Sequence, residues 1–200
     1  MKILHILSGL ALTALVSGAA LAQGPAAPAA PAAPGQPEIK NFGDWAVRCF
    51  PVQSASPCDM FQEQDDSQSK QRMLALSIAY DPHADRHVMQ IAVPLGVAVA
   101  PGVIVHTDKY SSPALPYRRC DRGGCYVELL TDGTMVDQLS HGGEGATVKI
   151  TADDGKKYDI KVSLNGFAAA HDSMVELARQ KAKAPPAAPA APATPAAPVK

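Results

Sequence analysis

The chain has 200 residues, a net charge of -1, 18% charged residues and 46% hydrophobic residues. This length predicts one domain, and a nearly balanced charge without a basic stripe argues against nucleic acid as a partner. Eleven of the 18 prolines fall in two Ala/Pro-rich segments, residues 23–37 and 184–200. Because these segments lack large apolar side chains, we expect disordered spacers or solubilising tails there. Residues 38–183 form the predicted domain.

The first 22 residues have the pattern of a secretory signal peptide. Lys2 gives a short positive start, residues 3–20 are mostly apolar, and residues 20–22 (Ala-Leu-Ala) match a small-residue cleavage site. We therefore predict cleavage between Ala22 and Gln23, and export to the periplasm or the outer envelope. A membrane-spanning helix is the alternative, but the run ends without a charged stop-transfer patch. No later segment is predicted to span a membrane.

Between the flanks, short alternating segments bounded by turn residues predict a mostly β domain. The expected strands are residues 42–49, 72–80, 87–93, 97–100, 103–108, 117–120, 125–130, 146–152 and 157–164. Pro101-Gly102 and the Asp-Asp-Gly-Lys stretch at 153–156 are turn signals between them. Short strands at this spacing predict an antiparallel β-sandwich or a barrel-like domain.

Two helical segments interrupt the strand pattern. Residues 134–140 predict a short helix that Asp132 starts and the glycines at 142 and 143 stop. Residues 167–183 predict a C-terminal amphipathic helix with Asn165 as its N-cap. Its apolar stripe comprises Phe167, Ala170, Met174, Leu177 and Ala178, whereas His171, Glu176 and Arg179 lie elsewhere. We expect this stripe to close one end of the core; a partner-binding helix is the alternative.

The four cysteines, Cys49, Cys58, Cys120 and Cys125, all lie in the part of the chain expected to be exported. An even number in an oxidising compartment predicts two disulfides, with three connectivities. We favour the local one, Cys49 with Cys58 and Cys120 with Cys125, because the Asp-Arg-Gly-Gly turn can set the second pair opposite each other on a hairpin. Zinc ligation is the alternative, but neither pair has the two-residue gap of a zinc knuckle.

The strongest candidate for a metal site is the set Asp81, His83, Asp85 and His87. In an extended segment their alternation would place all four on one face. We favour a simpler interpretation, a polar turn that Pro82 starts between two strands. The sequence therefore predicts no metal ligands here.

The remaining chemical motifs are weaker. Ser140-His141 beside two glycines is more simply a helix end than a catalytic pair, and Trp45 is more simply a core residue than a ligand platform. The chain has no Gly-x-Ser-x-Gly, Walker or Gly-x-Gly-x-x-Gly motif. The Asp-Asp-Gly start at 153–155 lacks the later acidic residues of a calcium loop. We predict no catalytic and no cofactor-binding residues.

Four landmarks occur in a fixed order along the domain. Gly43 and Trp45 precede the first cysteine pair, VPLGVAVAPGVIVHTD spans residues 93–108, the Cys-x4-Cys pair follows, and VSLNGFAAA spans residues 162–170. This ordered set resembles the invasion-associated locus B family of exported bacterial proteins over roughly residues 40–180. The segments are specific as a set, whereas any one of them is a weak signal.

The resemblance implies a compact, mostly β protein of the periplasm or outer envelope, without established catalytic residues. It also implies a link to host-cell entry, since founding members are implicated in the entry of pathogens into red blood cells. We therefore predict a non-enzymatic envelope protein that binds an unidentified protein or envelope component. A small periplasmic hydrolase or metal-dependent enzyme is one alternative. An envelope-stability protein whose Ala/Pro segments contact the cell wall is another.

Overall fold

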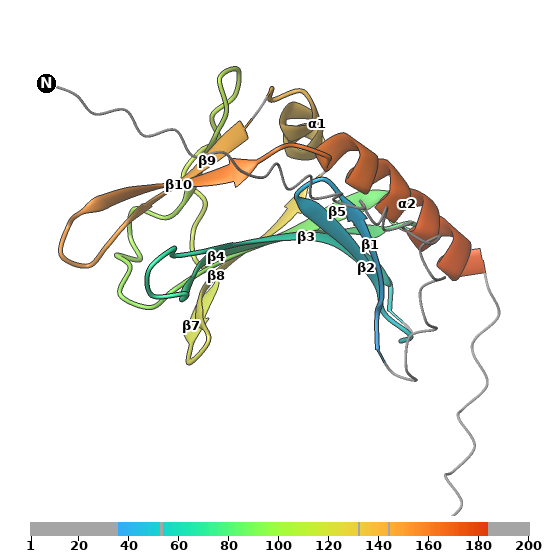
Figure 1. Cartoon of the computed structure of the whole chain (residues 1–200), viewed down its shortest axis with the longest axis horizontal. Helices are drawn as coiled ribbons and strands as arrows, with labels where there is room; N and C mark the ends of the chain where they lie inside the picture. The colour runs from blue at the N-terminus through green and yellow to red at the C-terminus, as the bar shows by residue number, and fades with distance from the viewer. Residues whose placement is uncertain (1–35, 53, 132, 144, 184–200) are drawn as a thin grey trace, which may run out of the picture. The chain divides into compact units, whose positions relative to one another are not determined.

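The computed structural model describes residues 36–52, 54–131, 133–143 and 145–183 of the chain. Within them lie ten strands and two helices, and the strands form two antiparallel sheets (Figure 1). The prediction of a mostly β, antiparallel domain with a short helix and a C-terminal helix is confirmed. The expected signal peptide, most of the first Ala/Pro-rich segment and the whole of the second lie outside the described residues.

The larger sheet has seven strands in the order β1-β2-β3-β4-β5-β8-β7. These strands are β1 (Glu38–Phe42), β2 (Trp45–Cys49), β3 (Cys58–Asp65), β4 (Arg72–Asp81), β5 (Arg86–Val93), β7 (Arg119–Asp121) and β8 (Gly124–Thr131). The smaller sheet, in the order β10-β9-β6, contains β6 (Ile104–His106), β9 (Gly145–Thr151) and β10 (Lys157–Ser163). The barrel-like alternative is wrong, because the seven-stranded sheet ends on two separate edges, β1 and β7.

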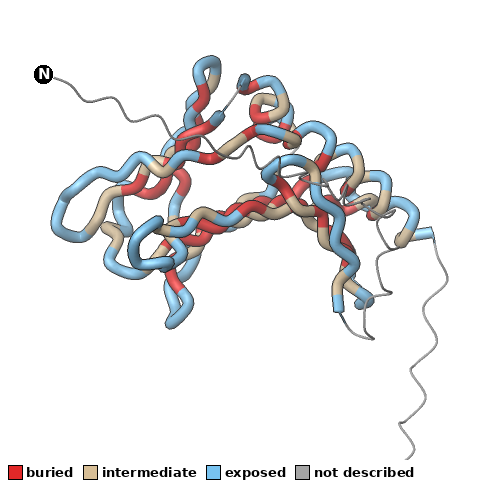
Figure 2. The backbone as a smooth tube through the Cα atoms, in the orientation of Figure 1, coloured by how far each residue is buried: buried red, intermediate tan, exposed pale blue. Residues whose placement is uncertain are grey.

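The smaller sheet and the helix α2 (Phe167–Lys183) lie on the same side of the seven-stranded sheet (Figure 1). The short helix α1 (Thr134–Ser140) contacts α2 and β8. The buried residues, red in Figure 2, lie along the strands and helices of these layers. Strand β5 illustrates the alternation, since Met89 and Ile91 are fully buried while Val88 and Gln90 on the opposite face are half-buried.

The structure differs from the expected strands in three places. Residues 42–49 are two strands rather than one, because Gly43 takes a φ of +57° and the chain turns so that Phe42 pairs with Trp45. Strand β3 was not expected, because its core-facing positions include a glutamine, Gln62, which breaks the apolar alternation. Residues 97–100 form no strand and contribute only an isolated bridge from Val97.

The helix bounds match the expected ones, whereas the expected N-cap of the second helix, Asn165, does not cap it. Gly133 precedes α1, and Asp132 lies outside the described residues. Gly166 precedes α2, and the Ala170 N–H donates to its carbonyl at 2.9 Å. Asn165 instead directs its side-chain amide toward the Asp44 carboxylate at 3.5 Å.

The turn between β1 and β2 is bonded to the segment that leads from β10 into α2. The Trp45 indole N–H donates to the Ser163 carbonyl at 2.9 Å, and the Ser163 hydroxyl donates to the Asp44 carboxylate at 2.6 Å. The Asp44 N–H donates to the Asn165 carbonyl at 3.2 Å. We call residues 43–45, Gln62 and residues 163–167 the turn clamp, because together they bond the β1–β2 turn to the segment from β10 into α2.

Gln62 connects the two sides of the turn clamp from within the sheet. Its amide donates at 3.1 Å to the carbonyls of both Asp44 and Ser163, and it accepts the Ser163 N–H at 3.1 Å. A buried amide with its donors and acceptor matched avoids the penalty of an unpaired polar group. Beneath it, the rings of Trp45 and Phe167 meet edge to face with centroids 5.0 Å apart.

We predict that Gly166→Ala destabilises the domain far more than Gly155→Ala. Both glycines have nearly equal φ values, +83° and +84°, but a Cβ on Gly166 would lie 2.0 Å from the Phe42 carbonyl oxygen, whereas Gly155 has open space. Gly155→Ala should lower the free energy of unfolding by about 1 kcal/mol, the strain of a left-handed alanine. Gly166→Ala should lower it by about 3 kcal/mol or more. Denaturant unfolding measures both. Equal losses would show that the close approach to Phe42 contributes nothing.

Candidate functional site

One face of the seven-stranded sheet points away from the smaller sheet and α2, and no element of the described chain covers it (Figure 1). We call it the outer face. Its side chains alternate along each strand with core residues, and most of them are at least partly exposed, whereas Ala75 and Ala92 are buried at 8% and 4% exposure. The partly or fully exposed ones include Arg48, Asp59, Phe61, Ser77, Ala79, Val88, Gln90, Arg119, Tyr126, Glu128 and Leu130.

The middle of the outer face is built from short side chains. In the register of β3, β4 and β5, Ser77 lies between Phe61 and Gln90, and Ala79 pairs with Val88. The sheet also bends, since β1 and β2 turn downward relative to β4 and β8 in Figure 1. The middle of the face is thus polar or weakly apolar, and the arginine side chains lie on β2 and β7 at its two sides.

At one side, Arg48 on β2 is held flat against an aromatic ring. Its guanidinium carbon lies 3.9 Å from the centre of the Phe61 ring and 5.7 Å from that of Phe50. The same guanidinium donates twice to Asp59, from Nε to Oδ1 at 2.9 Å and from Nη2 to Oδ2 at 2.5 Å. Because a fork of two hydrogen bonds and a stacking contact fix the side chain, little further rotamer entropy is lost when a partner binds.

At the other side, Arg119 on β7 makes an equivalent arrangement. Its guanidinium carbon lies 3.8 Å from the centre of the Tyr126 ring, and its Nε lies 3.3 Å from Glu128 Oε1. Asp121 binds the same guanidinium. The two stacks are five strand spacings apart, roughly 24 Å along the sheet at 4.8 Å a strand. Arginine and aromatic side chains are enriched at protein interfaces, so the outer face has the composition of a binding surface.

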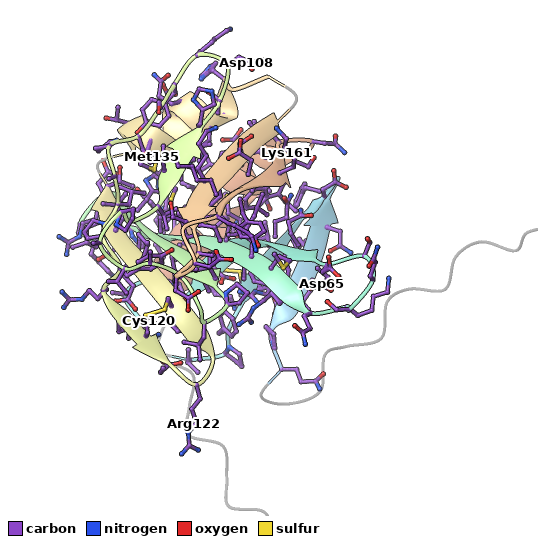
Figure 3. The ribbon with its side chains drawn as sticks, turned by 90° about the vertical axis from the view of Figure 1, so that its left-hand side faces the viewer. Asp65, Asp108, Cys120, Arg122, Met135 and Lys161 are labelled. Atoms are coloured by element: carbon purple, nitrogen blue, oxygen red, sulfur yellow. A yellow bond between two sulfur atoms is a disulfide. The ribbon has the colours of Figure 1, made fainter. Side chains whose placement is uncertain are left out.

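A second candidate is an open hollow of about 650 Å³ where the two sheets meet. Figure 3 labels two of the residues that line it, Asp108 after β6 and Lys161 on β10. Its polar groups bind their own neighbours: Lys161 donates to the Thr147 hydroxyl at 3.1 Å, and Ser163 donates to Asp44 in the turn clamp. Because a carboxylate rather than an imidazole binds the Ser163 hydroxyl, this serine lacks the usual base of a nucleophile.

The candidate metal residues do not share one face. Asp81 ends β4, and its Oδ1 accepts the N–H of His83 at 2.9 Å, so it closes a turn. Asp85 accepts the Tyr80 hydroxyl, while His87 points inward from β5. Burial first, and then the neighbouring His171, lower the pKa of His87. Among the described residues, no cluster of three or more His, Cys, Asp or Glu side chains could hold a metal ion.

The other two motifs have structural partners. The Ser140 hydroxyl donates to the Val136 carbonyl at 3.0 Å, and His141 lies 2.8 Å from the Asp137 carbonyl at the end of α1. Trp45 is 1% exposed within the turn clamp. The outer face and the pairing of His87 with His171 cannot be predicted from local sequence patterns, because both depend on contacts between distant segments.

The four cysteines form two bridges in the structure. Cys49 and Cys58 are opposite each other on β2 and β3 with Cα atoms 4.1 Å apart, and Cys120 and Cys125 are opposite each other on β7 and β8 at 4.0 Å. The first bridge is buried, whereas Cys120 is exposed near the hairpin tip that Arg122 extends into solvent (Figure 3). Two disulfides indicate an oxidising, extracytoplasmic compartment.

The described helices offer no membrane span, since neither combines sufficient length with sufficient apolar character. This finding applies to the described part of the chain.

Comparison with known proteins gives consistent matches. The family model of the invasion associated locus B protein matches residues 45–175. Two curated relatives, each an invasion protein B homolog from Brucella abortus (strain 2308 and biovar 1 strain 9-941), are 26% identical over 140 residues, covering 70% of this chain and 80% of theirs. The crystal structure of invasion associated protein B from Bartonella henselae is similar, with a TM-score of 0.61 and 21% identity, covering 71% of this chain and 99% of that one.

We predict different costs for the loss of the two disulfides. Replacing Cys120 and Cys125 by Ala should cost about 2 kcal/mol, the loop-closure entropy of a short loop. Replacing Cys49 and Cys58 should cost about 1–2 kcal/mol more, because those sulfur atoms also fill the core. Denaturant unfolding measures both.

Peptide mapping without reductant is the control for these pairings. It should give one peptide joining Cys49 to Cys58 and another joining Cys120 to Cys125. A linked peptide that joins a residue of one pair to a residue of the other would contradict the local connectivity.

Proposed function

Because the chain belongs to the invasion associated locus B protein family, we propose that it is an exported, non-enzymatic envelope protein that binds a protein partner through its outer face. One observation carries the proposal: the outer face is uncovered by the described chain and holds two prearranged arginine–aromatic stacks. The names of the relatives refer to invasion and not to a catalysed reaction, which supports a role in binding.

The chemistry of the outer face favours a protein over a polyanion. Its charges occur as pairs of opposite sign, Arg48 with Asp59 and Arg119 with Glu128, so it attracts no long run of phosphates. Exposed apolar side chains stand at the ends of one row across the sheet, Ile39 at 59% and Leu130 at 61% exposed. Burying such side chains gives about 25 cal/mol per Å² of apolar surface.

Two independent features support the proposed compartment. The first 22 residues have the signal-peptide pattern described above, and the two disulfides suit a compartment beyond the cytoplasm. We therefore propose the periplasm or the outer envelope as the site of action. The names of the relatives make a host-cell partner a specific hypothesis, which the next experiment separates from a bacterial partner.

Site-specific photo-crosslinking in intact cells tests the binding surface. A photoreactive residue at Ser77, in the middle of the outer face, should give a discrete protein adduct, with bacteria alone for an envelope partner or only with host cells for a host partner. The matched control is the same residue at Tyr158, which is 42% exposed on the smaller sheet and should give no such adduct.

The second arm of this experiment removes one stack. Arg119→Ala should reduce the Ser77 adduct about tenfold, the effect of losing about 1.4 kcal/mol of binding energy. Its side chain is 45% exposed, so we expect the melting temperature to stay within about 2 °C. Equal adduct yields from Ser77 and Tyr158, or a yield unaffected by Arg119→Ala, would reject the outer face as the binding surface.

N-terminal sequencing of the protein recovered outside the cytoplasm tests export. We expect the mature chain to begin at Gln23, because signal peptidase recognises small residues at positions 20 and 22. A chain that still begins at Met1 would mean that the leader stays attached, and the proposal of a released protein would be wrong.

A further inference from the structure

Two histidines meet inside the domain, on the side opposite the outer face. The Nε2 atoms of His87 on β5 and His171 on α2 are 2.9 Å apart, and the ring centroids are 5.1 Å apart. His87 is only 9% exposed and lies against the Tyr80 ring, with centroids 5.1 Å apart. This contact therefore ties the C-terminal helix directly to the seven-stranded sheet.

The surroundings assign the protons of the neutral pair. His171 Nδ1 lies 3.3 Å from an Asp172 carboxylate oxygen, so Nδ1 holds the proton of that ring and its Nε2 accepts. His87 Nε2 therefore donates to His171, and His87 Nδ1 has no proton. That Nδ1 is buried, faces Gly133 and has no hydrogen-bond partner in the described part of the chain.

A further proton has no favourable place on this pair. Added to His87 Nδ1, it creates a buried N–H without an acceptor in the described chain. Added to His171 Nε2, it sets two N–H groups against each other at the 2.9 Å contact. If His87 instead takes the tautomer with its proton on Nδ1, its Nε2 can accept from His171, but the buried Nδ1–H again has no acceptor. Each protonated state therefore loses a hydrogen bond or buries an unmatched donor.

The charged and titratable groups around the pair do not remove this penalty. Tyr80 on β4 donates its hydroxyl to Asp85, and Arg179 on α2 donates to the same Tyr80 oxygen at 3.1 Å. Among the described residues, Asp85 and Asp172 are the carboxylates near the pair, and Arg179 adds a fixed positive charge. On β8, Thr131 pairs with His87 of β5, and Gly133 precedes α1. Neither residue is charged.

We propose that His87 and His171 form an acid-sensitive latch, which strengthens the attachment of α2 to the seven-stranded sheet at neutral pH and loosens it when the medium acidifies. The direction follows from proton linkage. Burial, and then His171, lower the pKa of folded His87, and the weaker attraction of Asp85 opposes them. The unfolded or released chain therefore takes up the proton first. The contribution of the pair to the stability of the folded domain is complete above about pH 6.5, the pKa of histidine in an unfolded chain. This contribution is lost as the pH falls through and below that value.

Amide hydrogen exchange on the full-length exported protein at pH 7.5 and 5.0 tests the latch. Protection factors, which correct for the intrinsic pH dependence of exchange, should fall about tenfold or more in α2. Those of β9 should change much less. In the same range, histidine NMR should show His87 titrating below the ordinary histidine value of about 6.5, because burial lowers its pKa. Titration of His87 at or above that ordinary value would overturn the proposal.

Variants separate the latch from general acid effects. The double variant His87→Phe/His171→Leu replaces the pair by apolar side chains, so α2 protection should be nearly equal at both pH values. His141→Gln, the matched control, should keep the full pH response of the wild type. A double variant that responds to pH like the wild type would overturn the latch. If it does not fold, the NMR titration of the wild type decides.

A Zn²⁺ titration distinguishes the latch from a metal site that uses the same two nitrogens. After treatment with chelator, Zn²⁺ should leave the melting temperature of wild type and His87→Gln unchanged. An increase in the wild type that is absent in His87→Gln would identify a metal site and overturn the latch.

Discussion

The fold depends on the turn clamp, where the β1–β2 turn crosses the segment from β10 into α2. Gln62 satisfies three backbone groups from the two crossing segments, and the Trp45 indole adds a fourth bond. Gly43 and Gly166 let the two backbones approach within a distance that a Cβ would prevent. Because the helix begins at this crossing, the clamp fixes where α2 lies on the sheet. That position brings His171 onto His87 and leaves the outer face without cover.

The landmarks that identify the family are therefore structural. Gly43, Trp45 and the Ser-Leu-Asn-Gly-Phe stretch at 163–167 all belong to the clamp, and Gly96 binds the Asp153 N–H to attach its loop to the β9–β10 hairpin. Each of these residues therefore has a structural partner within the domain. If the proposed function holds, binding would use side chains outside these segments, such as the arginine–aromatic stacks of the outer face.

The sequence predicted the parts of the structure that depend on local patterns. Both helices have the expected bounds, because an apolar stripe at helical spacing needs no distant partner. Strand β3 escaped prediction because Gln62 is buried only through its bonds to Asp44 and Ser163, which lie 18 and 101 residues away. The outer face could not be predicted from the sequence for a similar reason. Alternation separates two faces of a strand, but the choice of the covered face depends on where α2 and the smaller sheet pack.

The position of β1 has a mechanical consequence. This strand is one of the two edge strands of the large sheet, and its first residue, Glu38, pairs with Cys49 at the open end of the hairpin. A pulling force on the N-terminal side of the domain would load these pairs one after another, like a zipper, and not all together. Peeling would then meet the clamped Trp45, followed by the covalent link between Cys49 and Cys58. A force applied at this end would thus detach β1 at low tension before the core of the domain bears the force.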